Sequence, residues 1–322
     1  MAENETNQQQ VKMDEILKLL FQVSHRVLIL MLNSLFNEGY DIENTEISIS
    51  NNEFVAEDLS ILRGDLFLTV SATEKPYHYH IEFQTLNDAT MVIRMFEYGF
   101  QKARELARYN HNDETVLIIP KQLVIFIEQN RNIKNELKLR MIFPHGEEVT
   151  YLVPVMKYWK YNHKDLLKQK LYPLLPLQVF KLRYKMEHIK RKYGEENRHE
   201  FMETIMEAKQ IAEIVAWESK SLYDRHEIDG DDLHKILLAI ESIFAYINDK
   251  YTKVESLTEE VFKMAKTLYD PAVEQKGIEK GIEKGIEKTA LAALRKGLDL
   301  ETIMDITGLD QNKLLKLKEN NQ

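Results

Sequence analysis

Two runs of alternating apolar and polar residues, joined by a short polar turn, constrain this chain more than any other feature. The runs cover Arg63–Ser71 and Tyr77–Gln84, and Ala72–Pro76 separates them. Strict alternation is typical of half-buried strands, and a short turn that contains proline pairs two such strands as a hairpin. The sequence therefore predicts a β-hairpin with one apolar face and one polar face.

The polar face of this predicted hairpin is a candidate cation site. Alternation places Asp65, Glu82 and Gln84 on one face, opposite the apolar residues of both strands. Two carboxylates offer hard oxygen ligands, which suit Mg²⁺ or Mn²⁺. An ordinary solvated strand face would give the same pattern, and the spacing alone does not separate the two interpretations. We expect the Asp65 and Glu82 side chains to be partly solvated.

A helix is predicted to follow the hairpin, over about Asn87–Tyr109. Arg94 and Tyr98 lie four residues apart and share one helix face. If the helix packs on the sheet, Arg94 could hold a phosphate oxygen and Tyr98 could donate a hydrogen bond. The alternative is a surface ion pair between Arg94 and Glu97 beside a half-buried tyrosine. The inner stripe of the helix is predicted to consist of Val92, Phe96, Ala103 and Leu106.

An unbroken apolar run at Leu123–Ile127 predicts a central strand that is buried on both faces. The helix before it would then be a crossover between parallel strands. Two more strands are predicted at Glu136–Phe143 and Glu148–Val155. Before the hairpin, the sequence predicts one helix and two short strands, at Met13–Phe36, 47–49 and 54–55.

The order of motifs around the hairpin resembles a known family of nucleases. Arg-x-Asp-Leu, the alternating hairpin and Ile-Glu-x-Gln come in turn, followed by Arg94 and Tyr98 on the next helix. This order is similar to that of the Rpn group of the PD-(D/E)XK nuclease superfamily, the recombination-promoting nucleases that are also labelled transposases. The resemblance covers about Val27–Arg183 and a tail rich in Glu, Lys and Gly.

The resemblance implies a fold and an activity. The fold would be α/β, a PD-(D/E)XK-type mixed sheet flanked by helices. The activity would be DNA endonuclease chemistry that depends on Mg²⁺, or on Mn²⁺, with Asp65, Glu82 and Gln84 as catalytic residues. Asp65, Glu82 and the backbone carbonyl of Phe83 would hold the metal. Most of the superfamily has lysine where Gln84 stands, whereas the Rpn group shares the glutamine, whose neutral amide can only form hydrogen bonds.

The chain divides into five predicted segments. Residues 1–12 are polar and are expected to be disordered, and residues 13–193 would form the nuclease-like core. Residues 194–270 show helical periodicity and predict a helical subdomain, in which Asp229 to Asp232 form a helix cap. Residues 271–288 form a linker or helix, and residues 289–322 a helical tail with the outline of a helix-turn-helix.

The linker contains three copies of Gly-Ile-Glu-Lys, at Gly277–Lys288. Each glycine costs a helix about 1 kcal/mol relative to alanine, so the segment is either a flexible connector or a helix that a partner completes. The tail after it could contact phosphates through Lys313, Lys316 and Lys318, or it could mediate self-association. We expect a homodimer or a higher homo-oligomer that assembles through this tail.

A net charge of −9 is the wrong sign for a protein that coats nucleic acid by bulk attraction. A DNA partner would need a local basic surface instead. A solvated helix face is the alternative interpretation of any such run of charges. The candidate residues are Lys181, Arg183, Lys185, Lys190, Arg191 and Lys192.

Several classes of site are excluded or disfavoured. The chain has no cysteine, which excludes disulfides, thiolate metal sites and cysteine nucleophiles. It shows no Walker loop, dinucleotide fingerprint or His-Glu-x-x-His motif, so no small-molecule cofactor is expected apart from the metal. His78 and His80 are expected to be surface residues rather than zinc ligands.

The longest apolar run, Val27–Leu32, is too short to span a bilayer, and the first ten residues do not resemble a signal peptide. Together with the absence of cysteine, this favours a cytoplasmic protein without a membrane partner. The alternative to an endonuclease is a catalytically silent DNA-binding or scaffold protein that keeps the nuclease fold and assembles through its tail.

Overall fold

The computed structural model describes most of the chain, which divides into two compact units, 1–268 and 269–322, described separately below. Asp65 and most of the Gly-Ile-Glu-Lys repeats lie outside the described residues, as do residues 1–12. The described residues are 15–49, 53–55, 61–63, 66–72, 76–85, 88–109, 115–193, 197–271, 275, 285–286, 288–294, 298–310 and 313–314.

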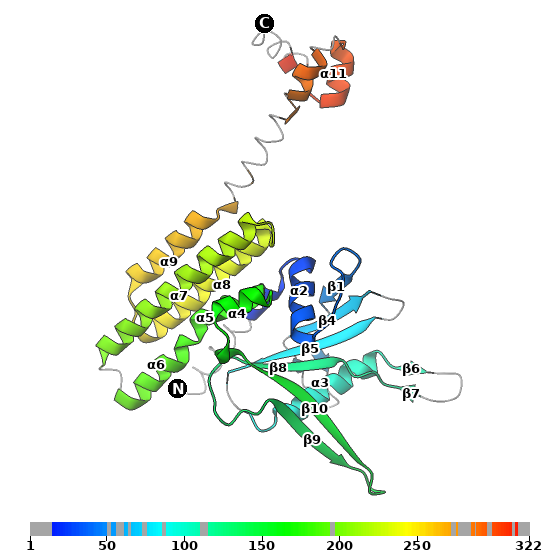
Figure 1. Cartoon of the computed structure of the whole chain (residues 1–322), viewed down its shortest axis with the longest axis vertical. Coiled ribbons are helices and arrows are strands. Elements are labelled where there is room, and N and C mark those ends of the chain that lie inside the picture. The colour runs from blue at the N-terminus through cyan, green and yellow to red at the C-terminus, as the bar shows by residue number, and fades with distance from the viewer. Residues whose placement is uncertain are drawn as a thin grey trace. The chain divides into compact units, whose positions relative to one another are not determined.

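The first unit contains a six-stranded mixed sheet in the order β1–β4–β5–β8–β10–β9, so the predicted α/β class is confirmed (Figure 1). The central strands β5, β8 and β10 are parallel, and the outer pairings are antiparallel. The strands of this sheet are β1 (Glu46–Ile49), β4 (Leu66–Ser71), β5 (Tyr77–Gln84), β8 (Lys121–Phe126), β9 (Glu136–Ile142) and β10 (Glu148–Lys157). Two small hairpins join β2 (Glu53–Val55) to β3 (Ile61–Arg63) and β6 (Arg108–Tyr109) to β7 (Thr115–Val116).

The predicted hairpin is confirmed as β4 and β5, which pair antiparallel with Leu66 opposite Ile81 and Phe67 opposite His80. The expectation that one face of it would be solvated is wrong. Phe67, His80 and Glu82 are all buried on the face that was expected to be polar. Because helices cover both faces of the sheet at this point, alternation along β5 separates two buried surfaces rather than core from solvent.

The helix α3 (Met91–Glu105) covers the His80 face, and it is the predicted crossover between the parallel strands β5 and β8. It starts and ends a few residues inside the predicted bounds. The predicted inner stripe is mostly wrong, because Val92, Phe96 and Leu106 are only half-buried. The sheet beneath the helix presents polar side chains, so a mixed face of the helix packs on it instead. The buried residues of this face are Met91, Met95, Tyr98, Gly99, Lys102 and Ala103.

The opposite face of the sheet is covered by α2 (His25–Phe36) and by the helical residues Glu15–Phe21. The predicted single helix over Met13–Phe36 is wrong, because the two described helices meet at 103°. Ser24 starts α2 as its N-cap, where its hydroxyl oxygen accepts a hydrogen bond from the Val27 amide. Among the described residues, no single helix is long and apolar enough to span a membrane. Only this bent pair, taken together, reaches that length and apolarity.

A layer of helices follows the sheet in the first unit, and α7, α8 and α9 lie side by side in it (Figure 1). The helical periodicity of this region is confirmed, and so is the cap at Asp229, which accepts from the Asp232 amide at 2.8 Å. The helices are η1 (Tyr158–Lys160), α4 (His163–Lys168), η2 (Tyr172–Leu174), α5 (Leu177–Phe180), α6 (Leu182–Tyr193), α7 (Arg198–Asp224), α8 (Gly230–Tyr251) and α9 (Glu255–Leu268).

The second unit has a small apolar core of its own. Its described helices are residues 288–294 and α11 (Leu300–Thr307), and α11 ends at Gly308 with a φ of +66°. Glycine adopts this left-handed conformation without strain, and it commonly ends helices in this way. Four residues are buried together here: Ala290, Ala293, Ile303 and Leu314.

Candidate functional site

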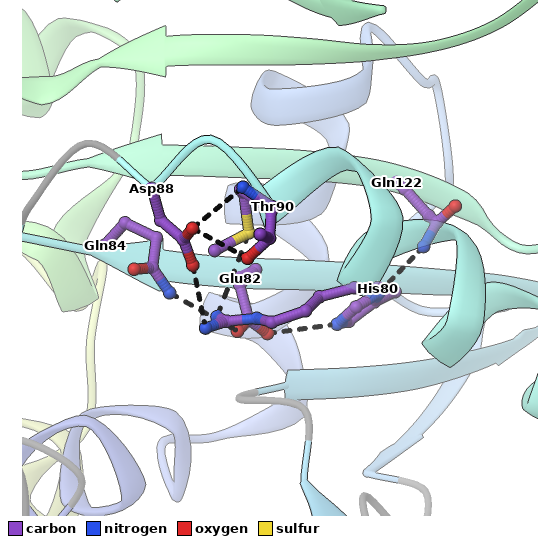
Figure 2. Close-up of polar contacts among 8 residues, drawn as sticks. His80, Glu82, Gln84, Asp88, Thr90 and Gln122 are labelled. Carbon is purple, nitrogen blue, oxygen red and sulfur yellow. Dashed lines mark hydrogen bonds and ion pairs between the residues drawn. The ribbon is translucent and has the colours of Figure 1, made fainter. Parts of the chain in front are cut away.

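Glu82 lies two residues before the carboxyl end of the central strand β5, and its side chain points under α3. The residue is only 3% exposed, so the expectation that this carboxylate would be partly solvated is wrong. A buried ionised carboxylate is costly unless hydrogen bonds and an opposite charge compensate it. Figure 2 shows His80 and Gln84, from the same strand, beside the carboxylate, and Arg94 of α3 contacts it as well.

Both oxygens of the Glu82 carboxylate accept hydrogen bonds. Arg94 Nη2 donates to Oε1 at 3.1 Å, and Gln84 Nε2 donates to the same oxygen at a longer distance of 3.5 Å. His80 Nε2 donates to Oε2 at 3.3 Å. The structure therefore brings together Glu82, Gln84 and Arg94, which the sequence predicts as site residues on two separate elements.

Arg94 also contacts a second carboxylate, Asp88, whose Oδ2 lies 3.4 Å from Nη1. These ion pairs correct the interpretation of Arg94 as a surface partner of Glu97. The arginine side chain is 33% exposed, and its Nε is buried and has no hydrogen-bond partner among the described residues. One guanidinium group thus bridges two carboxylates and still reaches the solvent.

Asp88 is a further residue of the candidate site, and it is not among the site residues predicted from the sequence. Its Oδ1 accepts from the Thr90 amide at 2.8 Å and from the Thr90 hydroxyl at 2.7 Å, and so fixes the turn that leads into α3. These hydrogen bonds from Thr90, together with the charge of Arg94, lower the pKa of Asp88. The sequence signal for this arrangement is an Asp-x-Thr motif just before a helix. An arginine follows the aspartate by six residues.

His80 is fully buried, so the expectation that it would be a surface residue is wrong. Its ring stacks on Phe67, with centroids 4.1 Å apart and planes 3° from parallel. Burial lowers the pKa of His80 to about 3, which keeps the imidazole neutral at physiological pH. The contact between His80 and Glu82 is therefore a hydrogen bond that a neutral ring donates to the carboxylate, and not an ion pair.

Tyr98 and Phe83 lie away from the open part of the site. Tyr98 is 6% exposed, and its ring meets the edge of His80 at 5.6 Å between centroids. The expectation that Tyr98 faces the substrate is not met, since its burial makes it part of the packing beneath α3. The Phe83 side chain lies on the other face of the sheet against Phe21, at 5.2 Å between ring centroids.

The chemistry of the described donors fits a hard divalent cation. Glu82 and Asp88 are two carboxylates against the single charge of Arg94, which leaves one negative charge in excess. Carboxylate and carbonyl oxygens are the ligands that Mg²⁺ prefers. The described residues hold no cluster of three His, Asp or Glu side chains that would form a complete site by itself. The predicted second ligand, Asp65, lies outside them.

The predicted basic surface loses one of its members. Arg183 is buried and donates from Nε to Glu128 at 2.6 Å, so it stabilises the interior and does not reach a nucleic acid. Lys181 donates to the Tyr161 carbonyl, and burial lowers the pKa of its amino group to about 8. Lys185 is exposed and pairs with Glu207 at 2.6 Å. The other members are Lys190, Arg191 and Lys192, at the end of α6.

Comparisons with known proteins add no family to this description. The chain matches no family model, no curated protein and no solved structure. The geometry around Glu82, together with the resemblance of the motifs, is therefore the basis for a functional proposal.

Proposed function

We propose that this chain is a divalent-metal-dependent DNA endonuclease of the Rpn type, with a PD-(D/E)XK-like core, that acts in recombination or transposition. One observation supports the proposal above all others. Gln84 and Arg94 converge on the buried Glu82 carboxylate, and these three residues belong to the motifs that carry the resemblance. A solvated strand face would not gather an arginine from another element onto one carboxylate.

In this proposal Glu82, Asp65 and the Phe83 carbonyl hold Mg²⁺ or Mn²⁺. The bound cation supplies a water molecule of lowered pKa and a positive charge beside the scissile phosphate. Arg94 holds a phosphate oxygen, because its guanidinium is partly exposed and offers five donors in a planar fork. Gln84 orients a reacting group through its amide, which cannot take over the charge of the more common lysine.

The proposed partner is DNA, held locally because the net charge of the chain is −9. The exposed basic residues of α6, which are Lys185, Arg191 and Lys192, would contribute to this contact. We further propose a cytoplasmic homodimer or higher homo-oligomer that assembles through the second unit. Two active sites in one assembly would allow each to cut one strand of a duplex.

The decisive experiment is a plasmid-nicking assay with the full chain. We expect nicking in Mg²⁺ or Mn²⁺ and none when the metal is chelated. Glu82→Gln should lower the nicking rate by about 100-fold or more, because the amide cannot replace a carboxylate ligand. Glu97→Gln is the matched control, since it makes the same change on the exposed face of α3 and should leave the rate unchanged.

A wild-type chain that binds DNA but does not cut it in either metal would contradict the proposal. That result would favour a scaffold protein in which Glu82 and Arg94 form a structural ion pair. Thermal unfolding of each variant would be measured alongside, so that a loss of activity caused by unfolding is recognised.

A further inference from the structure

A second row of polar side chains lies behind His80, on the side away from Glu82. Gln122 on β8 is 7% exposed, and its Nε2 lies 3.0 Å from Nδ1 of His80 (Figure 2). The same nitrogen donates to the Met95 carbonyl of α3 at 2.7 Å. On its other side, the Gln122 Oε1 accepts from the hydroxyl of Tyr151 on β10. The residues come from three strands and one helix.

These partners leave the Gln122 amide only one orientation. The Met95 carbonyl can only accept a hydrogen bond, so the nitrogen of the amide must face it. The Tyr151 hydroxyl then donates to the amide oxygen. Because the second hydrogen of the amide nitrogen points at His80, Nδ1 of the ring must be the acceptor, and the ring hydrogen sits on Nε2. This is the tautomer that donates to Glu82.

The packing around this row is shaped to hold it. Gly99 of α3 faces Gln122, and a β-carbon at that position would lie 2.9 Å from the amide oxygen. That distance is too short, so only glycine leaves room for the amide. Phe67 meanwhile stacks on the His80 ring, and the Tyr98 ring packs against it at an interplanar angle of 75°. The ring can therefore neither rotate nor shift without disturbing α3.

We propose that Tyr151, Gln122 and His80 form a relay of positioning residues that fixes the Glu82 carboxylate as a ligand for a divalent cation. The relay contacts Oε2, whereas Oε1 faces Arg94 and Gln84. Carboxylates that bind metals are themselves commonly oriented by hydrogen bonds from a second layer of residues. The proposal rests on the proposed function in taking Glu82 as a metal ligand.

The test is Mn²⁺ binding to the full chain, followed by electron paramagnetic resonance. Tyr151→Phe removes only the hydroxyl at the far end of the relay. We expect it to weaken Mn²⁺ binding by about 10-fold, the lower end of the effects seen for residues that support metal ligands. Tyr158→Phe is the matched control, because this buried tyrosine, in η1 directly after β10, donates to the Leu174 carbonyl and not to the relay. Its Mn²⁺ affinity should equal that of the wild type even if its melting temperature falls.

A spectroscopic readout tests the relay without any metal. Nitrogen-15 NMR of the histidine rings should show His80 with its hydrogen on Nε2 in the wild type. The proposal is overturned if that hydrogen is on Nδ1, or if folded Tyr151→Phe binds Mn²⁺ as tightly as the wild type. If the NMR and Mn²⁺ results are as expected but the chain cuts no DNA, only the proposed endonuclease activity is refuted. A chain that binds no Mn²⁺ would refute both.

Discussion

At the scale of single residues, the site is organised by the need to keep one buried carboxylate charged. Glu82 is compensated by a cation on one oxygen and a neutral donor on the other. Glu82 and Arg94 together carry no net charge and the neutral donor adds none, so the second carboxylate on Arg94, Asp88, leaves the site with one negative charge in excess. That remaining charge can attract a metal ion, whereas a fully neutralised pair would not.

The buried imidazole predicts a specific dependence of stability on pH. The pKa of His80 is about 3 in the folded chain and near 6.5 when it is unfolded, so the unfolded state binds more protons between these values. Its contribution is therefore fully present above pH 6.5 and is lost as the pH falls toward 3, at up to about 1.4 kcal/mol per pH unit.

This prediction is checked by urea unfolding of the wild type and of His80→Gln at pH 7.5 and pH 5. The free energy of unfolding should fall between the two pH values by about 2 kcal/mol more in the wild type than in the variant. An equal fall in both proteins would mean that the pKa of His80 in the folded state is not lowered by burial.

At the scale of helices and strands, Asp232 forms hydrogen bonds at the N-termini of two helices, α8 and α2. In α8 its Oδ2 accepts from the Asp229 amide at 3.2 Å, as the second half of a capping box. The same carboxylate accepts from the Ser24 amide at 2.6 Å and from the Ser24 hydroxyl at 2.7 Å. Ser24 in turn caps α2, so one buried side chain ties the helical layer to the sheet layer.

Asp232→Ala should destabilise the first unit by about 2 kcal/mol, since it removes this capping and leaves buried donors without partners. Asp231→Ala is the matched control in the same helical turn. Asp231 is exposed and pairs with Lys235 on the surface, so its loss should cost no more than about 0.5 kcal/mol. Chemical unfolding monitored by circular dichroism gives both values, and equal effects would show that Asp232 does not join the two layers.

Elements with a clear period could be predicted from the sequence, and those that depend on distant partners could not. The alternation of β4 and β5 and the apolar run of β8 specify strands because each pattern is local. The break at Ser24 is not predicted because apolar residues at helical spacing occur on both sides of it, and the side chain that holds the break, Asp232, lies far along the chain. The buried face of α3 differs from the predicted one because the sheet beneath it is polar.

The candidate site divides in the same way. The phases of β5 and of α3 are enough to place Glu82, Gln84 and Arg94 together. Nothing local to Gln122 or Tyr151 indicates that they meet behind His80, because their contact depends on strand order in the sheet. The periodicity of a strand or helix identifies which residues share a face. Only the order of the strands and helices in the fold identifies which other element packs against that face.

At the scale of the whole molecule, the two units have separate apolar cores. A chain that ends at Gln275 should therefore remain folded, with a melting temperature within a few degrees of that of the full chain. If the second unit mediates assembly as proposed, this shorter chain should sediment as a smaller species and should nick rather than break duplex DNA. Sedimentation velocity and the plasmid assay check the two parts.

Retention of the full assembly state by the shorter chain would assign self-association to the first unit. The second unit would then be a spacer or a DNA-binding appendage. Salt distinguishes these two, because every phosphate that the second unit neutralises should add about 0.9 to the slope of DNA affinity against salt on logarithmic axes. An appendage would therefore give the full chain a steeper slope than the shorter chain, and a spacer would give both the same slope.

The hydrogen bonds from Ser24 to Asp232 join residues that are 208 positions apart in sequence. On the ribosome, the first helix of the sheet layer would therefore emerge long before the side chain that completes its cap. We expect nascent chains that stop short of α8 to lack the Asp232 contacts at Ser24, so the start of α2 should be less stable in them than in the complete chain. Contacts between segments this distant also slow folding, so the first unit should reach its native state only after most of the chain has been synthesised.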